Sequence, residues 1–236
     1  MYGGNVTING GTIYCPNYIV KGSTYYQNDN YFGTVTINGG DITTDLYGVY
    51  GRGTVNVSGG DFVTKDNTLY LYGTSTINIT GGNIRSREKY GIYSNGSNTR
   101  VNVNSTDIEN SVIYGYKSAI HMEAGKLYFV DGKAVGETEY GVYLKDDAVF
   151  GIDDRVISIT KPEIVGNYYG LYVHPNVFTE VYDGIFKGKT EGYNGIITGV
   201  ADGYQLKEDG EEVVSEELTL NTVYLIEQDS FLQVKS

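Results

Sequence analysis

The chain has 236 residues, among them 33 glycines, 24 tyrosines and only 3 prolines, and it lacks tryptophan. Its 17 basic and 29 acidic residues give a net charge of -12, so most of its surface would repel a phosphate backbone, and we expect no nucleic-acid partner. It contains no apolar run of about 18 residues, which predicts no membrane span.

The N-terminal stretch MYGGNVTINGG shows no signal peptide, because it has neither a basic region nor an apolar core. A repeat begins almost at Met1. We therefore expect either a fragment of a longer chain with flanking domains or a mature region without its leader, and whether Met1 is the true start stays open.

The stretch Gly33–Ile42, GTVTINGGDI, is the unit from which most of the chain is built. Val35 and Ile37 alternate with threonine and asparagine, which sends the apolar residues to one face of a strand and the polar residues to the other. The Gly39-Gly40 pair then ends the strand, because glycine accepts turn conformations that other residues resist.

This unit recurs with insertions of variable length, as in a repeat protein whose loops absorb changes in length. Copies begin at positions 6, 35, 55, 77, 101, 127 and 157, and a weaker copy covers 181–186. Stacking the copies predicts three inward-facing ladders of side chains: Val6, Val35, Val55, Ile77 and Val101; Ile8, Ile37, Val57, Ile79 and Val103; and Ile13, Ile42, Phe62, Ile84 and Ile108.

A second short sequence motif, which we call the phrase, recurs alongside the repeat unit, so that each unit holds at least two short strands. Units of this size with two or three strands predict an all-β parallel β-helix of about eight turns, spaced about 4.8 Å apart. The phrase occurs as Tyr47–Tyr50, Leu69–Tyr72, Tyr90–Tyr93, Ser118–His121, Tyr140–Tyr143 and Tyr169–Tyr172.

The last part of the chain departs from the repeat. An acidic segment, KEDGEEVVSEE, precedes the strand-like stretch Leu218–Ile226. Because an open end of stacked turns exposes apolar side chains and strand edges, we interpret 1–186 as the repeats and 187–236 as a C-terminal β cap. Cys15, the only cysteine, alternates in phase with Ile13 and is predicted to be a small buried side chain.

The VxVxGGxI turns with YGVY-type second strands resemble the right-handed parallel β-helices of the pectate-lyase-like superfamily. Within it, they look most like the repeat-bearing surface proteins and carbohydrate-binding β-helix domains of Gram-positive bacteria. The resemblance covers about 4–186, and the tail YDGIFKGK…IITGV is similar to the C-terminal region of such surface proteins. It implies a right-handed coil and a bacterial cell-surface or secreted location.

The same superfamily includes polysaccharide lyases and hydrolases, in which clustered carboxylates hold calcium or act on the sugar bond. One cluster of charged residues in this chain could serve as such a catalytic or calcium-binding site. It is a weak candidate, because the motifs that accompany the paired aspartates of polygalacturonases are absent. His121 and His174 are isolated and predict no metal site. The cluster comprises Asp146, Asp147, Asp153, Asp154 and Arg155.

Two rows of outward-facing side chains are candidates for binding. An aromatic row could pack against sugar rings or simply stabilise the sheet, and its members are Tyr50, Tyr72, Tyr93, Tyr143 and Tyr172. A polar row could bind sugar hydroxyls or simply face solvent, and it comprises Thr34, Thr36, Asn38, Thr54, Asn56, Ser58, Thr76, Asn78, Thr80, Arg100, Asn102 and Asn104.

From these features we predict a non-catalytic structural or adhesive module that needs no cofactor and binds a polysaccharide or a cell-surface glycan. The alternative is a polysaccharide-active enzyme, a lyase or glycoside hydrolase using calcium or paired carboxylates around Asp146–Arg155. A groove with convergent carboxylates would favour the enzyme, and a smooth convex surface would favour the module.

Overall fold

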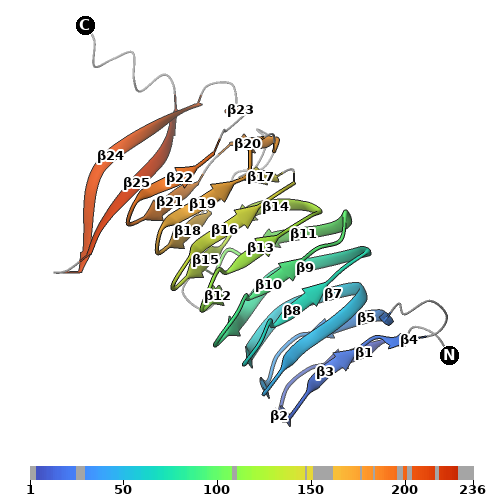
Figure 1. Cartoon of the computed structure of the whole chain (residues 1–236). Helices are drawn as coiled ribbons and strands as arrows, with labels where there is room; N and C mark the ends of the chain where they lie inside the picture. Colours follow the sequence, from blue (N-terminus) through green and yellow to red (C-terminus); the bar gives the residue numbers. More distant parts are fainter. Residues whose placement is uncertain are drawn as a thin grey trace, which may run out of the picture.

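The computed structural model describes residues 4–24, 30–107, 111–146, 148–150, 162–175, 177–182, 184–195, 199–200, 204–215 and 218–227. This part of the chain is all-β and contains no helix, so no helix in it has the length and apolar character needed to span a membrane. Parallel pairing between strands dominates, and the strands form layers that follow one another along a single direction (Figure 1).

Each layer contributes a strand to each of three faces. The first face holds β1 (Val6–Ile8), β5 (Asn30–Ile37), β11 (Asn98–Asn104), β14 (Lys126–Asp131), β17 (Ala148–Phe150), β20 (Thr179–Val181) and β23 (Gly199–Val200). The second holds β2 (Thr12–Cys15), β6 (Asp41–Thr44), β12 (Val112–Gly115), β15 (Lys133–Gly136), β18 (Glu163–Gly166) and β21 (Ile185–Gly188). The third holds β3 (Tyr18–Lys21), β8 (Leu69–Leu71), β10 (Ile92–Ser94), β13 (Ile120–Met122), β16 (Tyr140–Leu144), β19 (Tyr169–Val173) and β22 (Glu191–Asn194).

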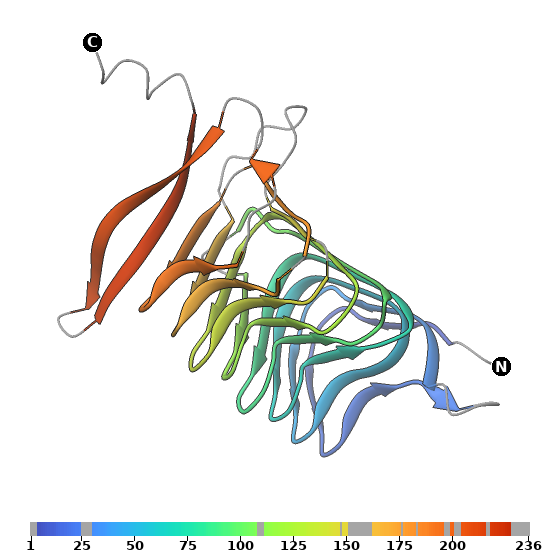
Figure 2. The same cartoon turned by 45° about the horizontal axis from the view of Figure 1, so that its top comes forward.

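Two long strands bend across faces. Strand β7 (Tyr47–Thr64) pairs with third-face, first-face and second-face strands in turn, and β9 (Thr74–Ser86) pairs with first-face and second-face strands. With these two included, eight layers can be traced through the described residues, from β1–β3 to β20–β22. Figure 2 shows the layers as nested bends of the chain.

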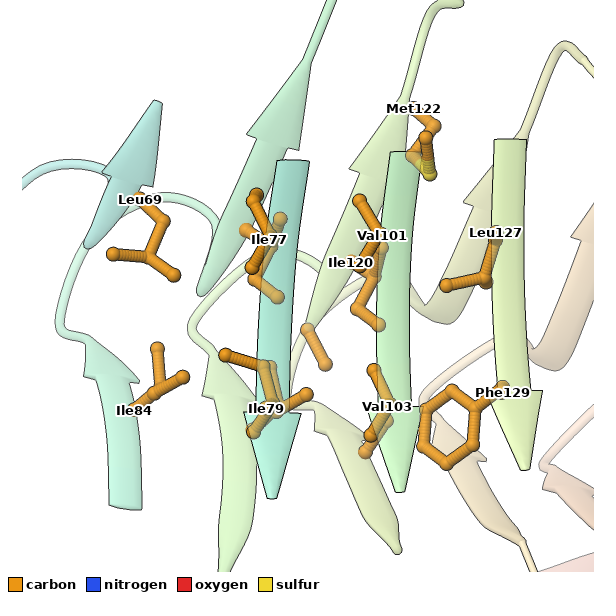
Figure 3. Close-up of a cluster of buried hydrophobic side chains, with 14 of the residues drawn as sticks. Leu69, Ile77, Ile79, Ile84, Val101, Val103, Ile120, Met122, Leu127 and Phe129 are labelled. Carbon is orange, nitrogen blue, oxygen red and sulfur yellow. The ribbon is translucent and has the colours of Figure 1, made fainter. Parts of the chain in front are cut away.

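The first two predicted ladders are confirmed by the strand register. Val35 lies opposite Val6 on one side and Val55 on the other, and Ile37 likewise lies between Ile8 and Val57. These side chains fill the space between the faces, and Figure 3 shows the central part of this core. In the inner layers they are fully buried, with Val35 and Ile37 at 0% exposure.

The third ladder is confirmed except at its last member. Ile84 pairs with Ile113 and not with the predicted Ile108, which lies outside the described residues. The corner between β11 and β12 is longer than the two-glycine corners before it, so the residue that pairs with Ile84 comes later in this copy than predicted.

The copy predicted to begin at Ile157 is also misplaced. Leu127 pairs with Ala148, and Ala148 pairs with Thr179, so this layer begins earlier than predicted. Its second-face member, Ile164, does lie on the predicted ladder opposite Ala134.

Parallel pairing continues past residue 186, the predicted end of the repeats. Strands β22 and β23 still pair in parallel with β19 and β20. The antiparallel pair β24 (Tyr204–Ser215) and β25 (Leu218–Glu227) follows, and β25 pairs antiparallel with β21. At the other end of the chain, the short β4 (Ser23–Thr24) pairs antiparallel with β5.

Cys15 differs from the prediction because it is only half-buried. Its Sγ atom donates to the Tyr18 carbonyl oxygen at 3.0 Å. The residues paired in line with it, Thr44 and Thr64, are fully buried. Cys15 is less covered because it belongs to the first layer, which has a neighbouring layer on one side only.

Candidate functional site

Aromatic rings line up along the third face. Because the strands of this face pair in register, one position of every layer from β7 to β19 falls on a single line. We call the rings at this position the aromatic stripe, and its members are Tyr50, Tyr70, Tyr93, His121, Tyr143 and Tyr172.

Each ring of the stripe contacts the next. In its first half the rings meet edge to face, with centroids 5.0 Å apart for Tyr50–Tyr70 and 4.8 Å for Tyr70–Tyr93. In its second half they stack, with centroids 5.5 Å apart for Tyr93–His121, 4.3 Å for His121–Tyr143 and 5.2 Å for Tyr143–Tyr172. Such aromatic pairs stabilise the sheet beyond the area that they bury.

A second set of tyrosines lies beside the stripe, three residues before its members. Their rings are 5.3 to 6.0 Å from those of the stripe, and we call Tyr47, Tyr90, Tyr140 and Tyr169 the flanking tyrosines. The five tyrosines of the stripe are half-buried as a result, and His121 is buried. Tyr143, for example, has His121 stacked on one side and Tyr172 on the other, so its ring edge and hydroxyl are the parts left for a ligand.

Four of the five tyrosines in the predicted aromatic row lie in the stripe, and Tyr72 does not. Val49 pairs with Leu69, which places Tyr70 opposite Tyr50 and shifts the phrase at 69–72 by two residues. Tyr72 lies beside the stripe instead, 5.9 Å from Tyr50 and 6.2 Å from Tyr70. Two leucines flank Tyr70, so alternation alone allowed either register.

Sequence reasoning also missed the first copy of the phrase, at Tyr18–Lys21. Tyr18 pairs with Tyr47 and its ring stacks 5.6 Å away, while Lys21 pairs with Tyr50 and lies over the Tyr18 ring. The signal was present as an aromatic residue followed by Ile19 and Val20, but this copy lacks the glycine that marked most of the others.

His121 brings a charged cluster into the stripe. Its Nε2 atom lies 2.8 Å from Glu123 Oε1, and the Lys145 ammonium donates to the other oxygen of Glu123. Burial lowers the pKa of His121, although the Glu123 carboxylate acts in the opposite direction. Burial would raise the pKa of Glu123, but its hydrogen bonds with Lys145 and His121 outweigh that effect and lower it.

The phenols around this cluster hold their protons more tightly than free tyrosine. Burial, reinforced by the Glu139 carboxylate, raises the pKa of Tyr90 to about 12. Burial is also the main cause of the raised pKa values of Tyr50, Tyr70, Tyr93 and Tyr143. At neutral pH these four tyrosines of the stripe therefore present uncharged hydroxyls, which can both donate and accept hydrogen bonds.

The predicted carboxylate cluster is only partly visible. Asp146 follows β16, and its Oδ2 atom accepts a hydrogen bond from the Gly125 amide at 3.1 Å. Asp147, Asp153, Asp154 and Arg155 lie outside the described residues, so the structure does not test whether they converge. Within the described ranges, no group of three or more histidine, cysteine, aspartate or glutamate side chains could hold a metal ion.

The polar row lies on the first face and bonds mainly within itself. Asn78 donates to Asn56 at 2.8 Å and accepts from Asn102 at 2.7 Å, so each layer is tied to the next by a side-chain amide. Asn38 donates in the same way to Asn9. This ladder uses much of the hydrogen-bonding capacity that a sugar would need, which makes the aromatic stripe the better candidate site.

Comparisons of the chain with protein-family models, with curated proteins and with solved structures found no match.

Proposed function

We propose that the layers are the turns of a right-handed parallel β-helix related in architecture to the pectate-lyase-like superfamily, with residues near the C-terminus as its cap. The parallel, in-register pairing from layer to layer supports this assignment. Connections between parallel strands of one sheet are right-handed in almost all known cases. The antiparallel pair β24–β25 supports a cap, because it adds strands of opposite direction to the last layer.

On this scaffold, the protein acts as a non-catalytic module of a bacterial cell-surface or secreted protein that binds glycan along the aromatic stripe. The observation that carries this proposal is the unbroken contact of rings from Tyr50 to Tyr172. Tyrosine combines an apolar ring with a polar hydroxyl, the combination that suits the CH groups and hydroxyls of a sugar. A rigid row also loses little conformational entropy on binding.

Removing hydroxyls while keeping the rings tests this site directly. We expect the wild-type protein to bind polysaccharide on a glycan array and a Tyr93→Phe/Tyr143→Phe variant to lose about tenfold or more in affinity, since each hydrogen bond contributes about 0.5–1.5 kcal/mol. The melting temperature should stay nearly unchanged, because the ring contacts remain. Tyr14→Phe, at a 63% exposed tyrosine on the second face, is the matched control and should bind normally.

Unchanged binding by the double phenylalanine variant would exclude the stripe as the site. The same polysaccharides, assayed for new reducing ends and unsaturated products, separate the module from the alternative lyase or hydrolase. Turnover of any of them would overturn the non-catalytic proposal.

A further inference from the structure

His121 is the one member of the aromatic stripe that is not a tyrosine. Tyr93 and Tyr143 occupy its position in the adjacent layers, with ring centroids 5.5 and 4.3 Å away, and Tyr90 lies 4.4 Å away on the flank. Only 8% of the residue is exposed. The imidazole is therefore enclosed by three phenol rings at the centre of the stack.

The hydrogen bonds assign the proton of this imidazole. A carboxylate only accepts, so the neutral ring carries its proton on Nε2 and donates it to Glu123 Oε1 at 2.8 Å. The other ring nitrogen, Nδ1, is then an acceptor, and it is buried without a hydrogen-bond partner. A protonated ring would place a second N–H at Nδ1, where the structure provides no hydrogen-bond partner.

Some of the charges around His121 favour the protonated imidazole, and others oppose it. The carboxylates of Glu123 and of Glu139, which precedes β16, favour a positive imidazole, and the Lys145 ammonium from the end of β16 opposes it. Both carboxylates already have cationic partners, since Glu123 pairs with Lys145 and Glu139 with Lys117. The rings of Tyr90, Tyr93 and Tyr143 complete the surroundings, and burial between them favours the uncharged form.

We propose that His121 makes the aromatic stripe acid-sensitive, so that protonation of its buried Nδ1 atom breaks the ring stack between Tyr93 and Tyr143. The lowered pKa of His121 means that stability falls as the pH falls, because the folded protein then binds fewer protons than the unfolded chain. The stabilisation that the neutral imidazole contributes is complete above the pKa of His121 in the unfolded chain, near 6.5. It is lost as the pH falls from there through the lower pKa of His121 in the folded protein. This inference does not depend on what the stripe binds.

Thermal unfolding measured between pH 7.5 and 5.5 tests the proposal, because most carboxylates stay ionised in this window and the chain has only two histidines. Tyrosine fluorescence and near-ultraviolet circular dichroism can follow the transition. We expect the melting temperature to fall over this interval, by about 3–5 °C for each pKa unit between the folded and unfolded states.

Two variants distinguish the contribution of His121 to this pH dependence from that of the rest of the protein. His121→Tyr restores the residue found at this position in the adjacent layers and should abolish the acid-induced loss, whereas His174→Asn, at the other histidine, should retain it. An unchanged pH dependence in His121→Tyr, or its disappearance in His174→Asn, would refute the proposal.

A titration of the unaltered protein keeps the test valid if His121→Tyr fails to fold. Proton NMR resolves the two imidazoles, and His174→Asn assigns them. We expect the His121 signal to titrate below the ordinary value and the tyrosine ring signals to shift with it. Titration of the His121 signal at or above about 6.5 would overturn the inference.

Discussion

At the scale of single residues, a row of glycines sets how sharply the chain turns from the second face to the third. A Cβ atom added to Gly115, Gly136 or Gly166 would lie only 1.8 to 1.9 Å from a backbone carbonyl oxygen three or four residues ahead. Backbone cannot move aside as a flexible side chain can. Earlier layers place larger residues at this position, such as the buried Thr64 and Ser86, so their corners leave room for a side chain that the glycine corners lack.

Gly136→Ala should therefore destabilise the protein strongly. The added methyl group would overlap the Tyr140 carbonyl oxygen, and we expect a loss of about 1–3 kcal/mol or more in the free energy of unfolding, measured by urea denaturation. Gly10→Ala is the matched control, because nothing lies within 4 Å of the position that its methyl group would take, and it should change stability by less than about 0.5 kcal/mol. Equal effects of the two substitutions would show that the corner is not tight.

At the scale of elements, the ladders hold the layers together, and a ladder position matters more where both neighbouring layers cover it. Val6 and Val35 occupy the same ladder in adjacent layers, yet Val6 is 36% exposed and Val35 is 0% exposed. The apolar area removed from water by the same side chain therefore differs sharply between the two positions. The first layer is held from one side, whereas the second is held from both.

Val35→Ala should cost about 2 kcal/mol in the free energy of unfolding, since it removes two buried methyl groups and leaves a cavity between packed layers. Val6→Ala makes the same chemical change in the open first layer and should cost less than about 1 kcal/mol. Denaturant titrations of both variants measure the difference. A loss at Val6 as large as that at Val35 would mean that the first layer is covered in solution.

The ladders also show how far the sequence could predict this structure. Alternation and paired glycines placed the first two ladders correctly, because both signals are local and the side-chain period of a strand is fixed. The errors at Ile108, Ile157 and Tyr72 all concern register across a corner or between similar neighbours. Corner length is decided by how one layer packs on the next, and no single residue signals it.

The sequence predicted the kind of candidate site, an aromatic row, but not all of its members or contacts. A tyrosine in the same phrase of successive copies predicted an outward aromatic row, and Tyr50, Tyr93, Tyr143 and Tyr172 do lie in it. His121 was visible at a tyrosine position, but its link to Glu123 and Lys145 was not. Glu123 and Lys145 lie 22 residues apart in adjacent layers, so their contact follows from the stacking, whereas His121 and Glu123 are only two residues apart.

At the scale of the whole molecule, stability should vary along the stack of layers. Each layer pairs mainly with the layers before and after it, so the described molecule behaves as a nearly one-dimensional array. A central strand such as β11 pairs on both sides, with β9 and β14, whereas β1 pairs with β5 alone. Opening of an end layer breaks one interface, and opening of a central layer breaks two.

Amide hydrogen exchange at pH 7.5 should reveal this gradient. We expect the slowest exchange in β9, β11 and β14 and exchange at least about 100-fold faster in β1, because one lost layer interface is worth several kcal/mol and each 1.4 kcal/mol is a factor of ten in the opening equilibrium. The amides of Val6 and Val101 give a matched pair, since both valines lie on the same ladder. Equal protection at the two valines would mean that the layers unfold as one cooperative unit, contrary to the nearest-neighbour view.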